Sequence, residues 1–158
     1  MRNNEYNIIN EVFNARLEDQ INGTLMAGYI YELGMPGKIL QRTGFPYEPI
    51  QLSARQLLRK SQHTRHPFDL GSVRNLVIAI QRPIAIFIYG DSNKAQNIIT
   101  ELQYNEKNFL VGIHFNTYNA NCISVSNIRG IFPKDNHEWL NWILQGKALY
   151  LKKKRFKI

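Results

Sequence analysis

The sequence contains a single cysteine, Cys122, in 158 residues. This excludes an intramolecular disulfide framework and any zinc site built from several cysteines. Because Cys122 stands in an apolar, strand-like run, we expect its side chain to be buried rather than reactive. A reducing interior suits such a protein best. We therefore expect a cytoplasmic location, or delivery into the cytoplasm of a target cell.

Long apolar runs are also missing. No stretch of about 18 apolar residues occurs, so we expect neither a membrane span nor a membrane partner. The first ten residues are polar and alternating, and they lack the charged, apolar and small-residue parts of a signal peptide. The sequence contains no glycine-rich phosphate loop and no G-x-S-x-G motif.

Acidic residues are scarce in the second part of the chain. Residues 1–52 carry a net charge of −2 and residues 53–158 a net charge of +10, which gives +8 in total. A basic face on a small domain is typical of a protein that binds a polyanion such as nucleic acid. The alternative is that the charge serves solubility alone.

The first part of the sequence favours helices. Apolar residues three to four apart in residues 4–20 predict an amphipathic helix that packs on the domain. Residues 38–43 predict a short helix, and Ile50 to Leu52 alternate like a short strand. Ser53 is suited to cap a helix over residues 54–62, with Leu57 and Leu58 facing inward. Ser72 is suited to cap another over residues 73–80. The buried stripe expected on the first helix consists of Ile8, Ile9, Val12, Phe13 and Leu17.

The second part of the sequence favours strands. Short apolar runs at residues 84–89, 97–102, 109–115 and 122–128 alternate with polar turns, and they predict an antiparallel meander. A helix follows over residues 138–144, capped by Asp135 or Asn136, with Trp139, Leu140 and Ile143 on its buried side. Residues 148–151 predict a last strand. The predicted fold class is α+β, with N-terminal helices packed on a four-stranded antiparallel meander sheet, a late helix and a short final strand.

The segment Leu58 to Leu70, LRKSQHTRHPFDL, is the strongest candidate for a site. It places His63 and His66 among cations, with one acid, Asp69. RNA cleavage by its own 2′-hydroxyl needs a base, an acid and cations that stabilise the phosphorane. His66 and His63 can supply the base and the acid, because imidazole titrates near neutrality. Cations around them disfavour a bound metal, so we expect neither metal nor cofactor. The alternative is a helix end with solvated charges.

The remaining catalytic candidates supply positive charge or a third imidazole. Lys60, Arg65 and Arg129 can stabilise a phosphorane. If Val111, Ile113 and Phe115 face the core, strand alternation places His114 on the other face, with Gly112 and Leu110. His114 can therefore join a site opposite the basic helix, or it can be a half-buried histidine with satisfied hydrogen bonds.

Basic residues cluster near the end of the chain without acids, and two aromatic residues lie among them. This pattern suits contacts to phosphates together with base stacking. A solvated tail is the alternative interpretation. The residues concerned are Lys147, Tyr150, Lys152, Lys153, Lys154, Arg155, Phe156 and Lys157.

An ordered set of motifs resembles a known family. The set begins with the G-x-P turn at Gly34, the KIL at Lys38, the P-I-x-L at Pro49 and a helix with Lys60 near its end. It continues with HPFDL, PIAIF, KAQNIITELQ, KNFLVGIHFN, SNIRGIFPKDNHEWLNWI and QGKALYLKKK. These motifs resemble the C-terminal domain of phage MuF-like proteins, which belong to the phage-type barnase–EndoU–colicin–RelE-like nucleases of toxins and mobile elements. The resemblance covers roughly Leu33 to Lys154.

The resemblance implies a domain organisation and an activity. We expect a single domain over residues 1–158, with an N-terminal helix and connector at 1–24 and a nuclease-like region at 33–154. The implied fold is helices on a four-stranded antiparallel meander. The implied activity is metal-independent cleavage of RNA, often tRNA, in a toxin or phage effector with a cyclic phosphate as product. An immunity or antitoxin protein is an implied partner.

The resemblance also assigns roles by position. The family's helix-borne Lys and its His fall on Lys60 and His66, and the late Tyr and Lys fall on Tyr150 and Lys152. The polar segment after the fourth strand falls on Ser126, Asn127 and Arg129. With Lys134, Lys147 and Lys153, these residues complete the expected RNA-binding set.

One departure from the family favours a second function. Many relatives carry Ser and Tyr before the Pro-Lys, where Gly130 and Phe132 stand here. The hydroxyl groups that would contact a phosphate are missing, and Ser126, Asn127 or Arg129 can substitute for them. The alternative function is a non-catalytic module that binds nucleic acid or a partner protein in a phage or mobile element. A weaker alternative is a purely structural domain.

Overall fold

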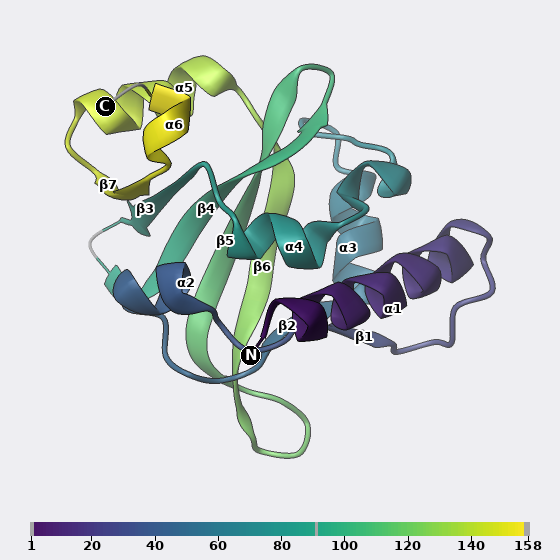
Figure 1. Cartoon of the computed structure of the whole chain (residues 1–158). Coiled ribbons are helices and arrows are strands. Elements are labelled where there is room, and N and C mark those ends of the chain that lie inside the picture. Colours follow the sequence, from purple (N-terminus) through teal and green to yellow (C-terminus); the bar gives the residue numbers. More distant parts are fainter. Residues whose placement is uncertain (1, 91, 157–158) are drawn as a thin grey trace.

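The computed structural model of the protein describes residues 2–90 and 92–156. Helices and strands alternate in the first part of the chain, and strands dominate the second part (Figure 1). In chain order the elements are α1 (Asn3–Ile21), β1 (Ile30–Glu32), α2 (Lys38–Arg42), β2 (Ile50–Ser53), α3 (Ala54–Ser61), the 3₁₀ turn η1 (Leu70–Val73), α4 (Leu76–Gln81), β3 (Ala85–Tyr89), β4 (Ser92–Tyr104), β5 (Lys107–Tyr118), β6 (Ser124–Lys134), α5 (Asn136–Leu144), β7 (Ala148–Leu151) and α6 (Lys153–Phe156).

The strands of the described chain form one seven-stranded sheet in the order β1-β2-β6-β5-β4-β3-β7. Its centre is the antiparallel meander β3-β4-β5-β6, so the α+β class is confirmed. The prediction of a four-stranded sheet was wrong in extent. The last strand, β7, extends the sheet beside β3, and β2 and β1 extend the opposite edge.

The strand that pairs with β2 could not be predicted from the sequence. β2 runs parallel to β6, with Ile50 opposite Ser126. Parallel neighbours are joined by long connections, and here three further strands lie between them in the sequence. The alternation of Ile50 and Leu52 therefore predicted a strand but not its partner.

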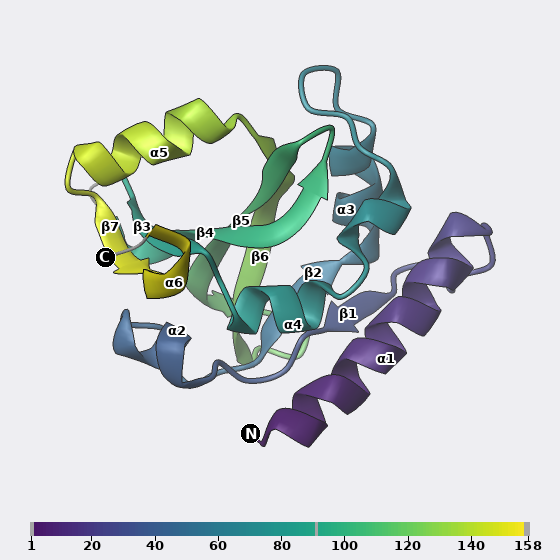
Figure 2. The ribbon, with the colours of Figure 1, turned by 45° about the horizontal axis from the view of Figure 1, so that its top comes forward.

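The two faces of the sheet are covered differently. One face packs under α1, η1 and α4 in the larger core, where Leu17, Val77 and Val111 are fully buried. On the other face α5 lies over part of the sheet (Figure 2). There Trp139 is 2 % exposed and packs with Leu110 and other apolar side chains in a smaller core. Because α5 is short, part of this second face stays open.

Helix α1 packs on the domain as expected, but with a different stripe. Ile8 and Val12 are 59 % and 52 % exposed, so the stripe expected from their spacing was partly wrong. The amides of Asn10 and Asn14 both donate to Asn75 Oδ1 at 2.9 Å, which turns a polar residue inward. The buried residues of α1 are Tyr6, Asn10, Phe13 and Leu17.

The capping residues of α3 and α5 were predicted correctly, but two leucines expected to be buried on these helices are exposed. Ser53 caps α3 by accepting from the Gln56 N–H, and Asp135 caps α5 by accepting from the His137 N–H. Leu58 and Leu140 are 39 % and 40 % exposed, so the expectation that they face inward was wrong. Each lies at the margin of its helix's apolar face, next to Leu57 and Trp139, which take the buried positions.

The helix expected over residues 73–80 is divided. The turn η1 ends at Val73 and α4 begins at Leu76, with Asn75 between them at φ +69°. The left-handed conformation of Asn75 interrupts the helix, so Ser72 lies inside the turn and caps nothing.

The interpretation of Cys122 was wrong. Its side chain is exposed, and its φ of +59° places it in the loop before β6, which begins at Ser124. Turn-forming asparagines at 119 and 121 precede it, and Asn119 Oδ1 accepts from the N–H groups of Asn121 and Ile123. Lys157, which was included in the basic tail, lies outside the described residues.

Candidate functional site

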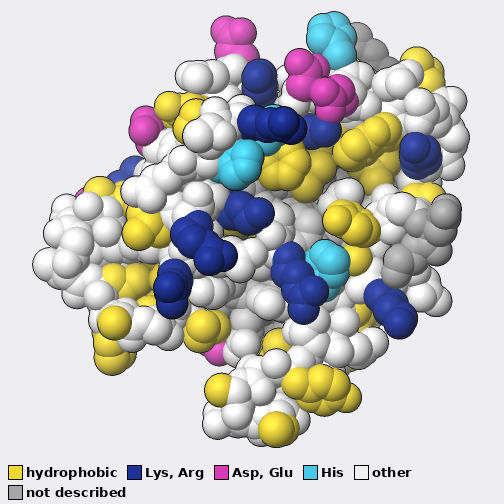
Figure 3. Space-filling view, turned by 180° about the vertical axis from the view of Figure 1, so that it is seen from behind, with side chains coloured by type: hydrophobic (Ala, Val, Ile, Leu, Met, Phe, Trp, Pro, Cys, Tyr) yellow, Lys and Arg dark blue, Asp and Glu magenta, His cyan; other side chains and the backbone are white. Residues whose placement is uncertain are grey.

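A cavity of about 320 Å³ opens on the part of the second sheet face that α5 leaves uncovered. It lies between the sheet, the end of α3 and the side of α5. Seen from this side, Lys, Arg and His side chains gather over the middle of the face, and acidic side chains lie nearer its edge (Figure 3). The cavity is lined by Lys60, Tyr89, Asn97, Leu110, Gly112, His114, Arg129, Gly130, Phe132, Lys134 and Trp142.

Two glycines form the floor of this cavity. Gly112 and Gly130 are directly opposite each other on β5 and β6. A Cβ atom at Gly130 would lie 3.8 Å from Gly112, whereas one at Gly112 would lie only 3.1 Å from Asn97 Oδ1. The missing side chains leave space above the sheet at the point where His114 and Arg129 project.

The charged side chains that line the cavity are all basic. Lys60, Arg129 and Lys134 line it, and no Asp or Glu is among the described residues that do. Lys134 forms an ion pair with Glu138 of α5, but Lys60 and Arg129 have no carboxylate partner in the described chain. Cations that lack protein counterions make the cavity suited to an anion such as phosphate.

Lys60 and Arg129 come together because a hydrogen bond joins α3 to β6. The side-chain amide of Gln56 donates to the carbonyl oxygen of Arg129 at 2.8 Å. Gln56 lies one turn before Lys60 on the same helix, so this bond fixes the end of α3 over the cavity. Sequence reasoning named both Lys60 and Arg129, and the structure brings them together.

His114 lies in the cavity on β5, half-buried and with its ring at the edge of the Tyr89 ring at 5.3 Å. Burial lowers the pKa of His114 from its ordinary value, and the neighbouring Arg129 lowers it further. The imidazole is therefore neutral at pH 7 and can accept a proton. His114 is therefore half-buried, as one interpretation expected, and it also lines the cavity opposite the end of α3, as the other required.

His66 lies at the rim of the same cavity. Its ring stacks on Phe132, with centroids 4.8 Å apart, and Phe132 is one of the lining residues. The pKa of His66 is lowered, mainly by burial and further by His63, Lys134, Lys107 and Arg65. The backbone N–H of Phe68 donates to the carbonyl oxygen of Ser61 at 3.0 Å, which ties the loop that carries His66 back to the end of α3.

His63 is not among the lining residues. It is exposed, its ring is 6.1 Å from that of His66, and its Nδ1 accepts a hydrogen bond from the Arg65 N–H. What the structure shows for His63 is an electrostatic effect on its neighbour, because its charge lowers the pKa of His66.

The expected RNA-binding residues are dispersed. Ser126 is fully buried, and its hydroxyl donates to Glu48 at 2.7 Å, so a ligand on the surface does not reach it. Lys147, Tyr150, Lys152 and Lys153 belong to the region around β7, at the far edge of the sheet, and none of them lines the cavity. Lys152 lies 4.0 Å from Glu101.

Two lining residues were missed from the sequence. Tyr89 ends β3, and Asn97 lies on β4 opposite Gly112. The Oδ1 atom of Asn97 is buried and has no hydrogen-bond partner among the described residues. No sequence signal set Asn97 apart, because the same strand also carries polar residues such as Gln96 and Thr100.

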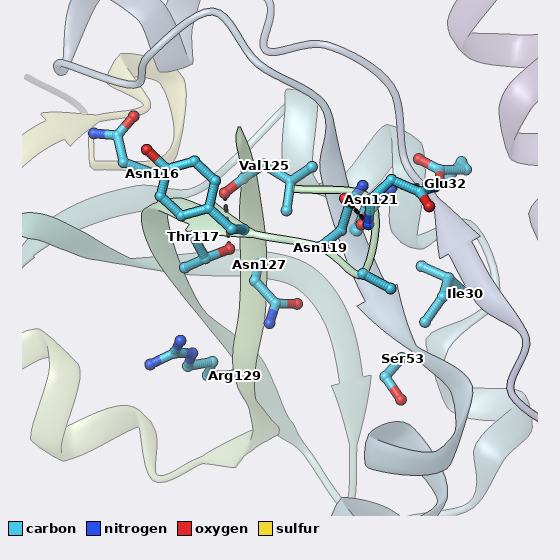
Figure 4. Close-up of a pocket in the computed structure, with 13 residues that line it drawn as sticks. Ile30, Glu32, Ser53, Asn116, Thr117, Asn119, Asn121, Val125, Asn127 and Arg129 are labelled. Carbon is cyan, nitrogen blue, oxygen red and sulfur yellow. Dashed lines mark hydrogen bonds between the residues drawn. The ribbon is translucent and has the colours of Figure 1, made fainter. Parts of the chain in front are cut away.

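A second cavity, of about 620 Å³, adjoins the first and shares Arg129 with it. It is a groove between the edge strands β1 and β2 and the loop that joins β5 to β6. Figure 4 shows Asn127 and Arg129 along β6, with Glu32 and Ile30 of β1 on the other side of the groove. Asn127, which was expected to bind RNA, lies here.

Neither metal-ligand clusters nor membrane-spanning helices are found in residues 2–90 and 92–156. No group of three His, Cys, Asp or Glu side chains is placed to hold a metal ion. No helix in that part of the chain is long and apolar enough to cross a membrane.

The comparisons with known proteins identify a family. The family model for the phage MuF-C-terminal domain matches residues 57–158, nearly two thirds of the chain. The chain belongs to this family. The matched residues include Lys60, Arg129, Lys134 and His114, which line the cavity, and His66 at its rim. The match begins inside α3, later than the Leu33 expected from the motifs. No curated protein and no solved structure matches the chain.

Proposed function

We propose that this MuF-C domain is a metal-independent ribonuclease of the barnase–EndoU–colicin–RelE-like type, acting as a toxin or phage effector. The observation that carries the proposal is the cavity itself, where a neutral imidazole lies beside two cations, Lys60 and Arg129, that have no carboxylate partner in the described chain. Cleavage through the 2′-hydroxyl needs these groups, namely a base, an anion site and a proton donor.

His114 is the proposed base and His66 the proposed acid. His114 takes the proton of the ribose 2′-hydroxyl, and the 2′-oxygen attacks the adjacent phosphorus. The bond from phosphorus to the 5′-oxygen breaks, and protonated His66 gives its proton to that oxygen. The products are a 2′,3′-cyclic phosphate and a free 5′-hydroxyl. In this assignment His114 takes the second catalytic role that the sequence suggested for His63, because His114 lines the cavity and His63 does not.

Lys60 and Arg129 are the proposed stabilisers of the phosphorane. Both lie in the cavity without a carboxylate partner in the described chain, so their charge is available to a phosphate. Fixed cations at the point where negative charge develops are worth several kcal/mol of transition-state stabilisation. The unpartnered Asn97 Oδ1 supports the proposal, since a buried acceptor without a donor suits a ligand hydroxyl.

The RNA backbone is proposed to run across the open face. Lys134 lies in the cavity, Asn127 in the adjoining groove, and Lys147, Tyr150, Lys152 and Lys153 around β7. Lys147 and Lys153 are exposed, so they are available for salt-dependent phosphate contacts on a longer RNA.

The test is cleavage of total tRNA in excess EDTA by the whole chain and by single variants. His114→Ala and His66→Ala should each lower the cleavage rate by about a hundredfold or more, the range for loss of an acid or base. His63→Ala and His137→Ala are matched controls, because both residues are exposed and outside the cavity, and they should retain most activity. Cleavage that stops in EDTA, or that survives both His114→Ala and His66→Ala, would overturn the proposal.

A second candidate is a binding module without catalysis, and one observation favours it. Gly130 and Phe132, which replace the hydroxyl-bearing residues of many relatives, both line the cavity. This candidate predicts salt-sensitive binding of tRNA with no cleavage, and equal binding by wild type and His114→Ala. The same experiment, read as a gel shift beside the cleavage assay, distinguishes the two.

A further inference from the structure

We propose that the groove beside the cavity binds one unpaired nucleobase next to the phosphate held by Lys60 and Arg129, and that Glu32 makes it prefer bases with an exocyclic amino group, guanine above all. This inference rests on the proposed function for its substrate, RNA, and adds where and how one base is recognised. It concerns residues 30–53 and the β5–β6 loop, which include much that lies outside the family match.

The position of the groove is the first argument. Arg129 lines both the groove and the cavity, so a phosphate at Arg129 has its neighbouring nucleotide at the entrance to the groove. Asn127 is two residues before Arg129 on β6 and projects into the groove on the same side (Figure 4). A volume of about 620 Å³ is within the range of small-ligand sites and exceeds what one base requires.

The chemistry of the lining is the second argument. Amide and hydroxyl side chains dominate, and they present the donors and acceptors that read base edges in single-stranded RNA. No described residue hydrogen-bonds the Asn127 side chain, so both its donor and its acceptor are available. Tyr118 stands at the end of β5 and is 73 % exposed, which provides an aromatic ring for stacking.

Glu32 is the acidic group in this lining, and it sets the expected preference. Gln51 donates to Glu32 Oε1 at 2.6 Å, which orients the carboxylate and leaves Oε2 without a partner in the described chain. A carboxylate accepts from exocyclic amino groups, which guanine, adenine and cytosine have and uracil lacks. Guanine presents two adjacent donors, N1–H and N2–H₂, that match both oxygens of one carboxylate.

The test measures binding rather than cleavage, so it does not depend on catalysis. The affinity of the whole chain for the 3′- and 5′-monophosphates of guanosine, adenosine, cytidine and uridine is measured by calorimetry. Guanosine monophosphate should bind about tenfold more tightly than uridine monophosphate, in keeping with one bidentate base contact. Glu32→Gln should remove this difference, and Gln51→Ala should reduce it. Lys60→Ala should weaken all four ligands alike.

The control is Glu106→Gln, which alters an exposed carboxylate in the β4–β5 turn and should leave the preference intact. Equal affinity for the four nucleotides, a preference that persists in Glu32→Gln, or no binding of any of them would each overturn the inference. Selective binding without tRNA cleavage would support base recognition by the groove and contradict the ribonuclease activity. Cleavage without selective binding would support the ribonuclease activity and contradict base recognition by the groove.

Discussion

His114 is subject to two influences that both disfavour its charged form, its burial and the guanidinium of Arg129. His66 is subject to the same pair of causes, burial first and then neighbouring cations. Histidine titrates at about pH 6.5 when nothing perturbs it, so both pKa values lie on the acid side of that point.

The first prediction concerns the pH dependence of cleavage. A base must be neutral and an acid protonated. A plot of kcat/KM against pH should therefore be bell-shaped, with its two limbs set by the titration of His114 and His66. Because both pKa values are lowered, the maximum should lie below about pH 6.5. The measurement is the initial rate of tRNA cleavage between pH 5 and pH 8. A maximum above pH 7 would contradict the assignment of these two groups.

Gly130 offers a second prediction at the residue scale. A Cβ at this position meets nothing closer than 3.8 Å, so Gly130→Ser fits and directs a hydroxyl into the cavity. One additional hydrogen bond to a charged phosphate should raise kcat/KM about tenfold. Gly130→Ala is the control, since it fills the same space without a donor. An equal effect of both substitutions would mean that the missing hydroxyl is unimportant.

The β5–β6 hairpin depends on a single buried carboxylate. Glu48, in the bend two residues before β2, accepts hydrogen bonds from the Asn116 N–H and from the hydroxyls of Ser124 and Ser126, all at 2.7 to 2.8 Å. Glu48 is 7 % exposed, so water does not replace these contacts when the carboxylate is removed. The carboxylate fixes the strand that carries Arg129.

Glu48→Ala should therefore lower the free energy of unfolding by about 3 kcal/mol, because several buried donors lose their acceptor. Urea denaturation of the variant beside wild type measures this change. Glu11→Ala, an exposed carboxylate on α1, is the control and should stay within about 0.5 kcal/mol of wild type. Equal stability of Glu48→Ala and wild type would show that the hydrogen bonds of Glu48 are not important for the fold.

Helices and strands were easier to predict from the sequence than the long-range contacts that they make. Alternation in residues 109–115 correctly placed His114 on the face opposite to the buried Val111 and Ile113. The stripe of α1 was misjudged because Asn10 is buried against Asn75, and a polar contact over 65 residues leaves no local pattern. The loop of Cys122 was read as strand because its apolar neighbours gave the stronger signal.

At the scale of the whole molecule, the site joins segments that are distant in the sequence. His114 on β5 and Arg129 on β6 are brought together by strand pairing, and the packing of α3 on the sheet brings Lys60, in its last turn, to the same cavity. Residue chemistry and the family resemblance named Lys60, His66 and Arg129, which the structure places in this cavity or at its rim. The groove of Glu32 could not be foreseen, because it needs β1 and β2 at the sheet edge beside β6.

The most direct test of the central claim is the mass of the RNA ends that the protein produces. An RNA cut in excess EDTA should yield upstream fragments with a 2′,3′-cyclic phosphate and downstream fragments with a 5′-hydroxyl. Methylation of the 2′-oxygen at the cut nucleotide should abolish that cut. Fragments that end in a 3′-hydroxyl, or cleavage at the methylated nucleotide, would contradict the account.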